Sequence, residues 1–436
     1  MWASRFLKGR NARAITKTSI AAAASAPTSQ AEFSANSQAF SVAVTELLEC
    51  LDFVLDQLDD QGKGSFMKNK LESGEHGDLL QFHLSRLAKE ISKYENSKVD
   101  EQTSQPWTGD RDLLELLLAA CRCACSVYKP DVHPGGDLVP VISRTPSITG
   151  TVKATSIWKS EDTNTLFVSI RGTSCKTDHL VNFNKKQKDA GSVFAFPGTN
   201  EQIHAHSGFL ACAATLLPWL TEEIIRQVAA DKSLKDVVFT GHSAGGAVAA
   251  MVFLHFVCHC PSDLSNAKFS LITFGAPPVT STNITELAQG LPQTRDIYAL
   301  VNEHDLVPRV DQGYITSIIS LYRSAYGLPL SDFNNTTFMN NTQAGRNQDI
   351  IWKLPPPDFY VAGNVIVLRA KLDHKALQST SRQASTDCTT PPQKLDILLV
   401  SPIEFCKLLF FEISVHKRKI YLNRLERLVQ ESGGTV

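Results

Sequence analysis

A serine flanked by two glycines is the residue whose setting points most directly to chemistry. A short apolar run at 237–240 leads into Gly-His-Ser-Ala-Gly at 241–245, and small residues then continue at helical spacing from Ala247. Strand, sharp turn and helix in this order are what a nucleophile elbow requires. The turn would expose the Ser243 hydroxyl, and the helix would direct unbonded backbone N–H groups toward it.

A glycine-rich turn after a strand can also bind a phosphate group. The lysine and the serine or threonine that end a P-loop are absent here, and so is the Gly-x-Gly-x-x-Gly spacing of a dinucleotide site. We therefore interpret Ser243 as a candidate nucleophile, which needs a neighbouring base to react at neutral pH. The backbone N–H of Ala244, the next residue, is then a candidate donor to a developing oxyanion.

Composition excludes some classes of function. The 436 residues are 43% hydrophobic, and 43 Lys and Arg balance 44 Asp and Glu. Such a chain can bury one large core, and its balanced charge gives no electrostatic reason to expect nucleic acid. Most of the ten cysteines lie in apolar helical patterns, which is typical of buried free thiols in a reducing compartment. Cys121, Cys123 and Cys125 are spaced by two residues and lack a nearby histidine, so we predict no metal and no other cofactor.

The opening of the chain is basic and rich in Ser and Ala, with no acidic residue before Glu32. We interpret residues 1–38 as a disordered basic tail; a mitochondrial transit peptide is the alternative. We expect no secretory signal, because no early apolar core is present. We also expect no transmembrane segment, because the glycine turn and histidines interrupt the apolar run 239–260. These features predict an intracellular protein, cytoplasmic or peripheral to a membrane.

Residues 39–147 have the pattern of amphipathic helices. Leucine and valine recur at helical spacing in 44–58, 80–91 and 110–127, with a polar linker at 93–109. Their apolar stripes must be covered, so we predict a helical N-terminal region that packs on the domain that follows. A separate helical module that binds a partner is the alternative.

From residue 148 onward, strand and helix patterns alternate. Strands are predicted at 149–158, 165–170, 237–240, 269–274, 297–301, 365–369 and 397–400, and helices at 210–230, 247–259 and 285–289. This alternation predicts an α/β domain over 148–436, with a mostly parallel central sheet and helices on both faces. The Asn-rich and Pro-rich stretch 313–360 interrupts it, and we interpret that stretch as an excursion at the rim.

Five motifs resemble, in order, those of the class 3 lipases, the fungal-type triacylglycerol lipases of the α/β-hydrolase fold. They are Phe167–Thr173 ending in Arg-Gly-Thr, His206–Phe209, Gly241–Gly246, Thr273–Pro278, and Val301–Pro308 with Asn-Glu-His-Asp. The resemblance is good over 148–310, moderate over the last 35 residues and weak over 313–395.

The resemblance implies a Ser–Asp–His triad, which in this fold runs along the chain in that order. Asp305 follows a predicted strand in an Asp-x-Val-Pro setting and is implied as the acid. The alternative is a structural role, in which its side chain caps the loop. His416, just before a predicted helix at 417–428, resembles the family histidine, and His374 is the competing candidate. His242 adjoins the serine, so its side chain points elsewhere and is expected to form a wall of the site.

The resemblance also implies a second oxyanion donor at Thr173 and a lid beyond it. Leu180, Val181 and Phe183 are the lid candidates, and a solvated loop is the alternative because three lysines follow by 188. Position 244 is alanine where the family motif commonly has leucine. We expect this difference to change the shape of the site more than its activity.

The expected activity is hydrolysis of carboxylic esters of lipids, chiefly tri- or diacylglycerols, through an acyl-serine intermediate. The expected partner is a lipid ester, at a membrane or lipid-droplet surface. A phospholipase and a soluble carboxylesterase are alternatives within the enzymes. An inactive hydrolase fold that binds lipid or acts as a scaffold is the alternative outside them.

Overall fold

The computed structural model describes residues 87–129, 132–146, 152–172, 187–198, 202–325, 351–372, 393–412 and 414–433. All of them belong to one compact unit, 44–436. The predicted tail and the predicted helix at 44–58 lie outside the described residues, as does most of the one at 80–91, of which 87–91 is helical.

The described strands are β1 (Gln105–Pro106), β2 (Leu138–Arg144), β3 (Thr155–Ser160), β4 (Thr165–Ile170), β5 (Gln187–Asp189), β6 (His204–His206), β7 (Asp236–His242), β8 (Lys268–Phe274), β9 (Thr294–Asn302), β10 (Asn364–Leu372) and β11 (Gln393–Val400). The α-helices are α3 (Arg111–Ser126), α5 (Ser207–Ala230), α6 (Ala244–Cys258), α7 (Thr285–Gln289), α8 (Gln312–Ala325), α11 (Pro402–Phe405) and α12 (Arg418–Gly433). Short 3-10 turns are η1 (Glu95–Ser97), η2 (Ser262–Leu264), η3 (Val307–Arg309) and η4 (Ser414–His416).

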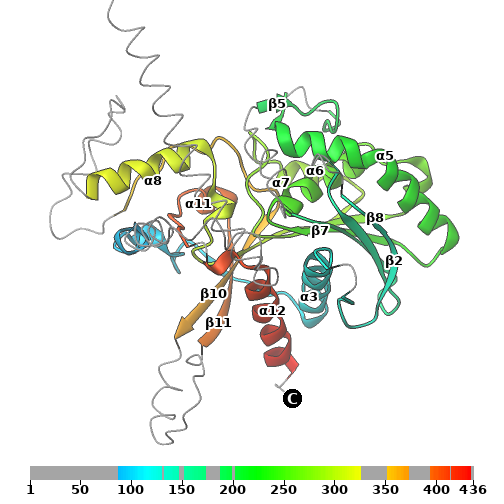
Figure 1. Ribbon diagram of the computed structural model, residues 1–436, viewed down its shortest axis with the longest axis horizontal. Coiled ribbons are helices and arrows are strands. Elements are labelled where there is room, and N and C mark those ends of the chain that lie inside the picture. The colour runs from blue at the N-terminus through cyan, green and yellow to red at the C-terminus, as the bar shows by residue number, and fades with distance from the viewer. Residues whose placement is uncertain are drawn as a thin grey trace, which may run out of the picture. The chain divides into compact units, whose positions relative to one another are not determined.

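The described residues form one large mixed sheet in the order β1-β11-β10-β9-β8-β7-β4-β3-β2 (Figure 1). Its centre, β4-β7-β8-β9-β10, is parallel, whereas β2, β3, β11 and β1 pair antiparallel at the two sides. The predicted mostly parallel sheet is therefore confirmed. In this register the end of β7 lies between the ends of β4 and β8, with Gly241 opposite both Ile170 and Thr273.

Helices cover both faces of the sheet, as the sequence predicted. Val237 and Phe239 of β7 point into the core shared with α5 and α6, while Val238 between them points into the core shared with α3 and α12. Because β7 is buried on both faces, it is a continuous apolar run rather than an alternating one. Burial on both faces holds the residue at the end of β7 in a rigid setting.

Three elements that precede residue 148 belong to the same layers. Helix α3 matches the predicted helix at 110–127, begins where the Asp110 side chain accepts from the Leu113 N–H, and packs against β7 and α12. Strand β2 adds an antiparallel edge beside β3, and β1 pairs with β11. The sequence did not predict β2 or β1.

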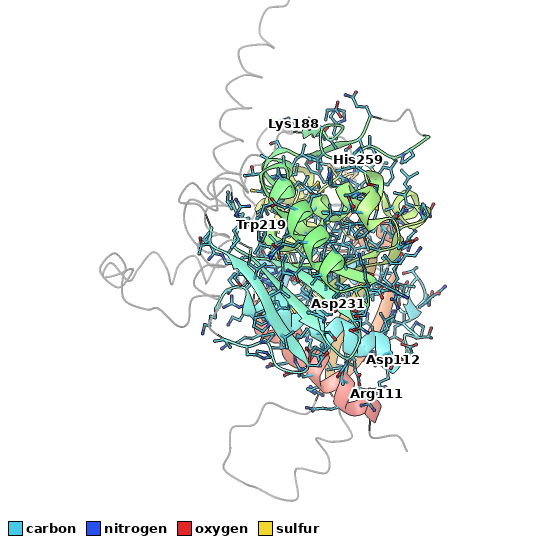
Figure 2. The ribbon with its side chains drawn as sticks, turned by 90° about the vertical axis from the view of Figure 1, so that its right-hand side faces the viewer. Arg111, Asp112, Lys188, Trp219, Asp231 and His259 are labelled. Carbon is cyan, nitrogen blue, oxygen red and sulfur yellow. The ribbon has the colours of Figure 1, made fainter. Side chains whose placement is uncertain are left out.

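Helix α5 is long and apolar enough to cross a membrane, and no other helix among the described residues is. Its buried side chains, including Leu216, Leu220 and Ile224, belong to the core of the sheet, as expected of a core helix. Trp219 of α5, labelled in Figure 2, is partly buried against this core. Its ring centroid lies 5.1 Å from the guanidinium carbon of Arg144 on β2.

The predicted rim excursion at 313–360 contains a helix. Helix α8 buries Tyr314, Ile315 and Ile318, and the Tyr314 hydroxyl donates to the carbonyl oxygen of Phe410 at 2.6 Å. Farther along, the Trp352 indole N–H donates to the Ser317 hydroxyl at 2.7 Å. Residues 326–350, including the Asn-rich stretch, lie outside the described residues.

Candidate active site

Ser243 stands at a sharp turn between β7 and α6. Its backbone has φ 57° and ψ −134°, a left-handed conformation that is costly for a residue with a side chain. Its N–H donates to the carbonyl oxygen of Phe274 at 2.9 Å, and its own carbonyl accepts from Gly246 at 2.9 Å. Hydrogen bonds on both sides hold the strained turn, and the side chain is half-buried.

The glycines around Ser243 are required by the close approach of the backbone. A Cβ on Gly245 would lie 2.1 Å from the carbonyl oxygen of Ile170, and one on Gly241 would lie 2.5 Å from the carbonyl carbon of Gly245. No side chain fits at either position without moving β4 or α6. The predicted strand, turn and helix are thus present, and the reason for the flanking glycines is steric.

Asp305 is fully buried just beyond the end of β9. One carboxylate oxygen accepts from the Val307 N–H at 2.9 Å, which fixes the side chain to the turn that follows. The backbone of this turn is paired to the chain near its C-terminus, because the Glu412 N–H donates to the His304 carbonyl oxygen at 2.7 Å. The acid loop therefore lies beside the segment that carries His416.

His416 is buried in η4 and contacts Asp305 directly. Its Nδ1–H donates to the two carboxylate oxygens at 2.8 and 3.1 Å. This bond leaves the lone pair on Nε2, which is buried and has no hydrogen-bond partner among the described residues. An imidazole oriented by a carboxylate, with an unpartnered nitrogen, can accept a proton from a nearby hydroxyl.

Two hydrogen bonds fix the backbone around His416. The His242 Nε2–H donates to the His416 carbonyl oxygen at 2.7 Å, and the Asn302 side-chain amide donates to the Val415 carbonyl oxygen at 2.7 Å. The rings of His242 and His416 lie 4.6 Å apart. His242 therefore packs beside His416 and holds its backbone next to the elbow.

Gly275 explains why the ring of His416 can lie over the end of β8. A Cβ at Gly275 would lie 2.9 Å from Asp305 Oδ2 and 2.9 Å from two atoms of the His416 ring. Gly275 also has φ +57°, which suits glycine. It follows Phe274, whose carbonyl oxygen accepts from Ser243. The structure thus gathers Ser243, Asp305 and His416 around the ends of β7, β8 and β9.

Tyr421, on the first turns of α12, completes the surroundings of Asp305. Its hydroxyl donates to Asp305 Oδ2 at 2.6 Å and accepts from the Asn302 N–H at 3.0 Å. Burial raises the pKa of Tyr421 well above its usual range, and the nearby Asp305 carboxylate adds to this effect. The phenol therefore stays protonated and remains a donor. The sequence analysis missed Tyr421, because no local pattern signals its contact with an acid 116 residues away.

Of the other predicted site residues, only Ala244 lies among the residues that the structure describes. Ala244 is buried as the first residue of α6, where a backbone N–H has no acceptor within the helix. Thr173, the lid candidates and His374 lie outside the described residues. The residue before Thr173 is described: the Gly172 N–H donates to the Tyr128 hydroxyl at 3.0 Å.

No three His, Cys, Asp or Glu side chains in the described part of the chain gather as a metal would require. Cys121 and Cys123 are buried in the core between the sheet, α3 and α12. Burial raises the pKa of both thiols well above the usual range.

Residues 167–314 match the family model described as lipase (class 3). The segment includes Ser243 and Asp305 but ends before His416. No curated protein sequence matches the chain.

Among solved structures, the fold is similar to that of several fungal lipases. The Rhizomucor miehei lipase propeptide complex has 15% identity and a TM-score of 0.46, covering 74% of this chain and 85% of that one. The lipase from Rhizopus microsporus var. chinensis has 17% identity and a TM-score of 0.45, covering 72% and 88%. A triacylglycerol lipase from Penicillium expansum has 15% identity and a TM-score of 0.39, covering 60% and 81%.

Proposed function

We propose that the chain, of which residues 167–314 match the class 3 lipase family, is a serine hydrolase that cleaves carboxylic esters of lipids, with tri- and diacylglycerols as its main substrates. The observation that carries the proposal is the buried contact between His416 Nδ1 and Asp305. Near the strained turn of Ser243, this contact leaves Nε2 without a hydrogen-bond partner among the described residues. Strain of this kind persists only where surrounding structure holds it, and it is common at catalytic residues.

In the proposed reaction, Ser243 attacks the ester carbonyl carbon while its hydroxyl proton passes to Nε2 of His416. Asp305 stabilises the imidazolium that forms. The tetrahedral intermediate collapses as the C–O bond to the alcohol breaks, and Nε2 returns the proton to the leaving alkoxide oxygen. A water molecule then attacks the acyl-serine by the same proton route, which releases the fatty acid and regenerates Ser243.

The negative charge on the carbonyl oxygen needs donors already in place. We assign these roles to the backbone N–H of Ala244 and to Thr173. Removing one such donor typically costs about 3 kcal/mol of barrier. We assign the lid to the segment with Leu180, Val181 and Phe183, whose apolar side chains would meet a lipid surface. An intracellular protein bound peripherally to a membrane or lipid droplet fits this substrate.

The test compares hydrolysis of emulsified trioleoylglycerol with that of a dissolved short-chain ester. Ser243→Ala should lose at least about 1000-fold of both activities. Ser265→Ala removes an exposed hydroxyl on a distant turn and should retain both. The wild type should be faster on the emulsion than on the dissolved ester, as expected of an enzyme that acts at an interface.

Other outcomes would support one of the alternative functions. Hydrolysis of dissolved esters alone would indicate a soluble carboxylesterase, and preference for phospholipid vesicles over the emulsion would indicate a phospholipase. Failure of the wild type to hydrolyse any of the three, together with binding to the emulsion, would contradict the enzyme and favour a lipid-binding scaffold.

A further inference from the structure

Tyr128 and Arg418 connect two parts of the candidate site that are far apart in sequence. Tyr128 follows the end of α3, and Arg418 is the first residue of α12, two positions after His416. We propose that these two side chains are positioning residues, which together hold the end of β4, where the oxyanion donor follows, against the histidine loop. This inference rests on the proposed ester hydrolysis for its kinetic part.

The first contact fixes the chain as it leaves β4. The Gly172 N–H donates to the Tyr128 hydroxyl at 3.0 Å. A Cβ at Gly172 would lie 2.4 Å from that hydroxyl and 2.7 Å from the carbonyl oxygen of His242. Gly172 is therefore enclosed between the Tyr128 hydroxyl and the elbow. The Tyr128 hydrogen bond therefore restrains the residue that directly precedes the proposed donor Thr173 in the sequence.

The second contact fixes the Tyr128 ring. The Arg418 guanidinium lies 4.3 Å from the ring centroid, within the range of a cation–π interaction. The Tyr128 ring also makes a T-shaped contact with the His242 ring, with centroids 6.4 Å apart. His242 in turn donates to the His416 carbonyl oxygen. Tyr128 thus contacts the oxyanion side through its hydroxyl and the base side through its ring.

A planar guanidinium suits this place better than an ammonium group. It is weakly hydrated and can stack flat on an aromatic ring, whereas lysine is a compact and strongly hydrated charge. Arg418 begins α12, so a shift of its side chain and a shift of the His416 loop are coupled through short backbone. The stack therefore makes the position of Gly172 depend on the position of the histidine loop.

Tyr128→Phe separates the two contacts, because it keeps the ring on Arg418 and removes the hydroxyl that accepts from Gly172. With a dissolved p-nitrophenyl ester, kcat should fall by about tenfold to 100-fold with KM within about twofold, the pattern of a contact that matters in the transition state. Tyr298→Phe is the matched control: Tyr298 is a half-buried tyrosine of β9 with its own side-chain hydrogen bond, to Asp296, and it should keep wild-type kinetics.

Hydrogen exchange gives a readout that does not depend on activity. In Tyr128→Phe, the peptide containing Gly172 should exchange its amide faster, while peptides of β7 and α6 keep wild-type rates. If the wild type does not hydrolyse esters, the proposed function fails, yet this exchange result still decides whether Tyr128 holds Gly172. Unchanged exchange at Gly172, or wild-type kcat in an active enzyme, would overturn the inference.

Arg418→Lys tests the stack while keeping the charge. We expect kcat to fall in the same direction as for Tyr128→Phe, and the double variant to lose less than the product of the two single losses, because both changes act on one contact chain. The control is Arg122→Lys. Arg122 lies on α3 and pairs with Glu426 of α12, the helix that also carries Arg418, and this variant should leave kcat unchanged. Strictly multiplicative losses, or wild-type kcat in Arg418→Lys, would refute the link.

Discussion

The Tyr421 hydroxyl donates to Asp305 Oδ2 at 2.6 Å, the same oxygen that accepts from the His416 Nδ1–H at 2.8 Å. With the Val307 N–H on the other oxygen, the carboxylate receives three donors although it is fully buried. A buried charge is tolerated only when it is hydrogen-bonded in this way. Tyr421 is therefore part of what keeps Asp305 oriented toward His416.

Tyr421→Phe should lower kcat by about tenfold with little change in KM, because Asp305 loses a donor and gains freedom to rotate away from His416. Steady-state kinetics on a dissolved ester measures this. Tyr314→Phe is the control, since its hydroxyl is equally buried and donates at 2.6 Å to Phe410 instead. Equal kinetic losses in the two variants would assign Tyr421 a structural role only.

Gly275→Ala should inactivate the protein more than it destabilises it. The added methyl group would lie 2.9 Å from the His416 ring, so the imidazole must shift, which we expect to cost about 100-fold in kcat. The positive φ adds about 1–3 kcal/mol of strain. The control Gly290→Ala places its methyl group no closer than 3.5 Å to its nearest neighbour. An active Gly275→Ala would contradict the described position of His416.

Arg369→Met should destabilise the fold by about 3–5 kcal/mol, because it leaves a buried carboxylate unpaired. Arg369 donates to both oxygens of Glu303 at 3.0 Å, and both side chains are buried next to the acid loop. Chemical denaturation measures the change. Lys371→Met removes an exposed pair on the same strand and should cost less than about 1 kcal/mol. Similar costs for the two variants would show that the Arg369–Glu303 pair is not effectively desolvated.

The contribution of Asp311 to stability should fall as the pH rises from about 4 to about 6. Burial raises the pKa of Asp311 from 3.8 to about 6, against the opposing effects of the Tyr314 N–H and Arg309. The folded state therefore keeps a proton that the unfolded state releases, so stability present at pH 4 is lost as the pH approaches 6. A pKa difference of about two corresponds to about 3 kcal/mol.

Asp311→Asn should remove this falling contribution, so that stability relative to the wild type increases from pH 4 to pH 6, as measured by chemical denaturation at several pH values between 4 and 7. Asp263→Asn, at an exposed position, should keep the wild-type slope. Parallel curves for wild type and Asp311→Asn would show that Asp311 titrates normally in the folded protein.

Local patterns predicted the centre of the fold well. The apolar runs at 237–240 and 269–274 became β7 and β8, because strands buried on both faces must be apolar along their length. The elbow followed from glycine spacing, whereas Asp305 and His416 were singled out by the family resemblance. These features depend on neighbours in sequence or on a motif.

Other features depend on neighbours that are distant in sequence. Strand β2 contains Pro140 and lies at an edge with partly exposed residues, so its pattern is weak. Tyr421 and Asn302 are 119 residues apart along the chain. They acquire their roles only when α12 packs beside the end of β9. Tyr128 is a similar case, because its partner Gly172 follows the end of β4 and its partner Arg418 begins α12. No local periodicity signals such contacts.

The most direct test of the central claim is the labelling of Ser243 by a fluorophosphonate, located by peptide mass and timed in wild type and in His416→Gln. The account predicts that Ser243 alone is phosphonylated in the wild type, and that the rate falls by at least about 1000-fold in His416→Gln because the serine has lost its base. A wild type that is not labelled at Ser243, or a His416→Gln variant labelled at the wild-type rate, would contradict it.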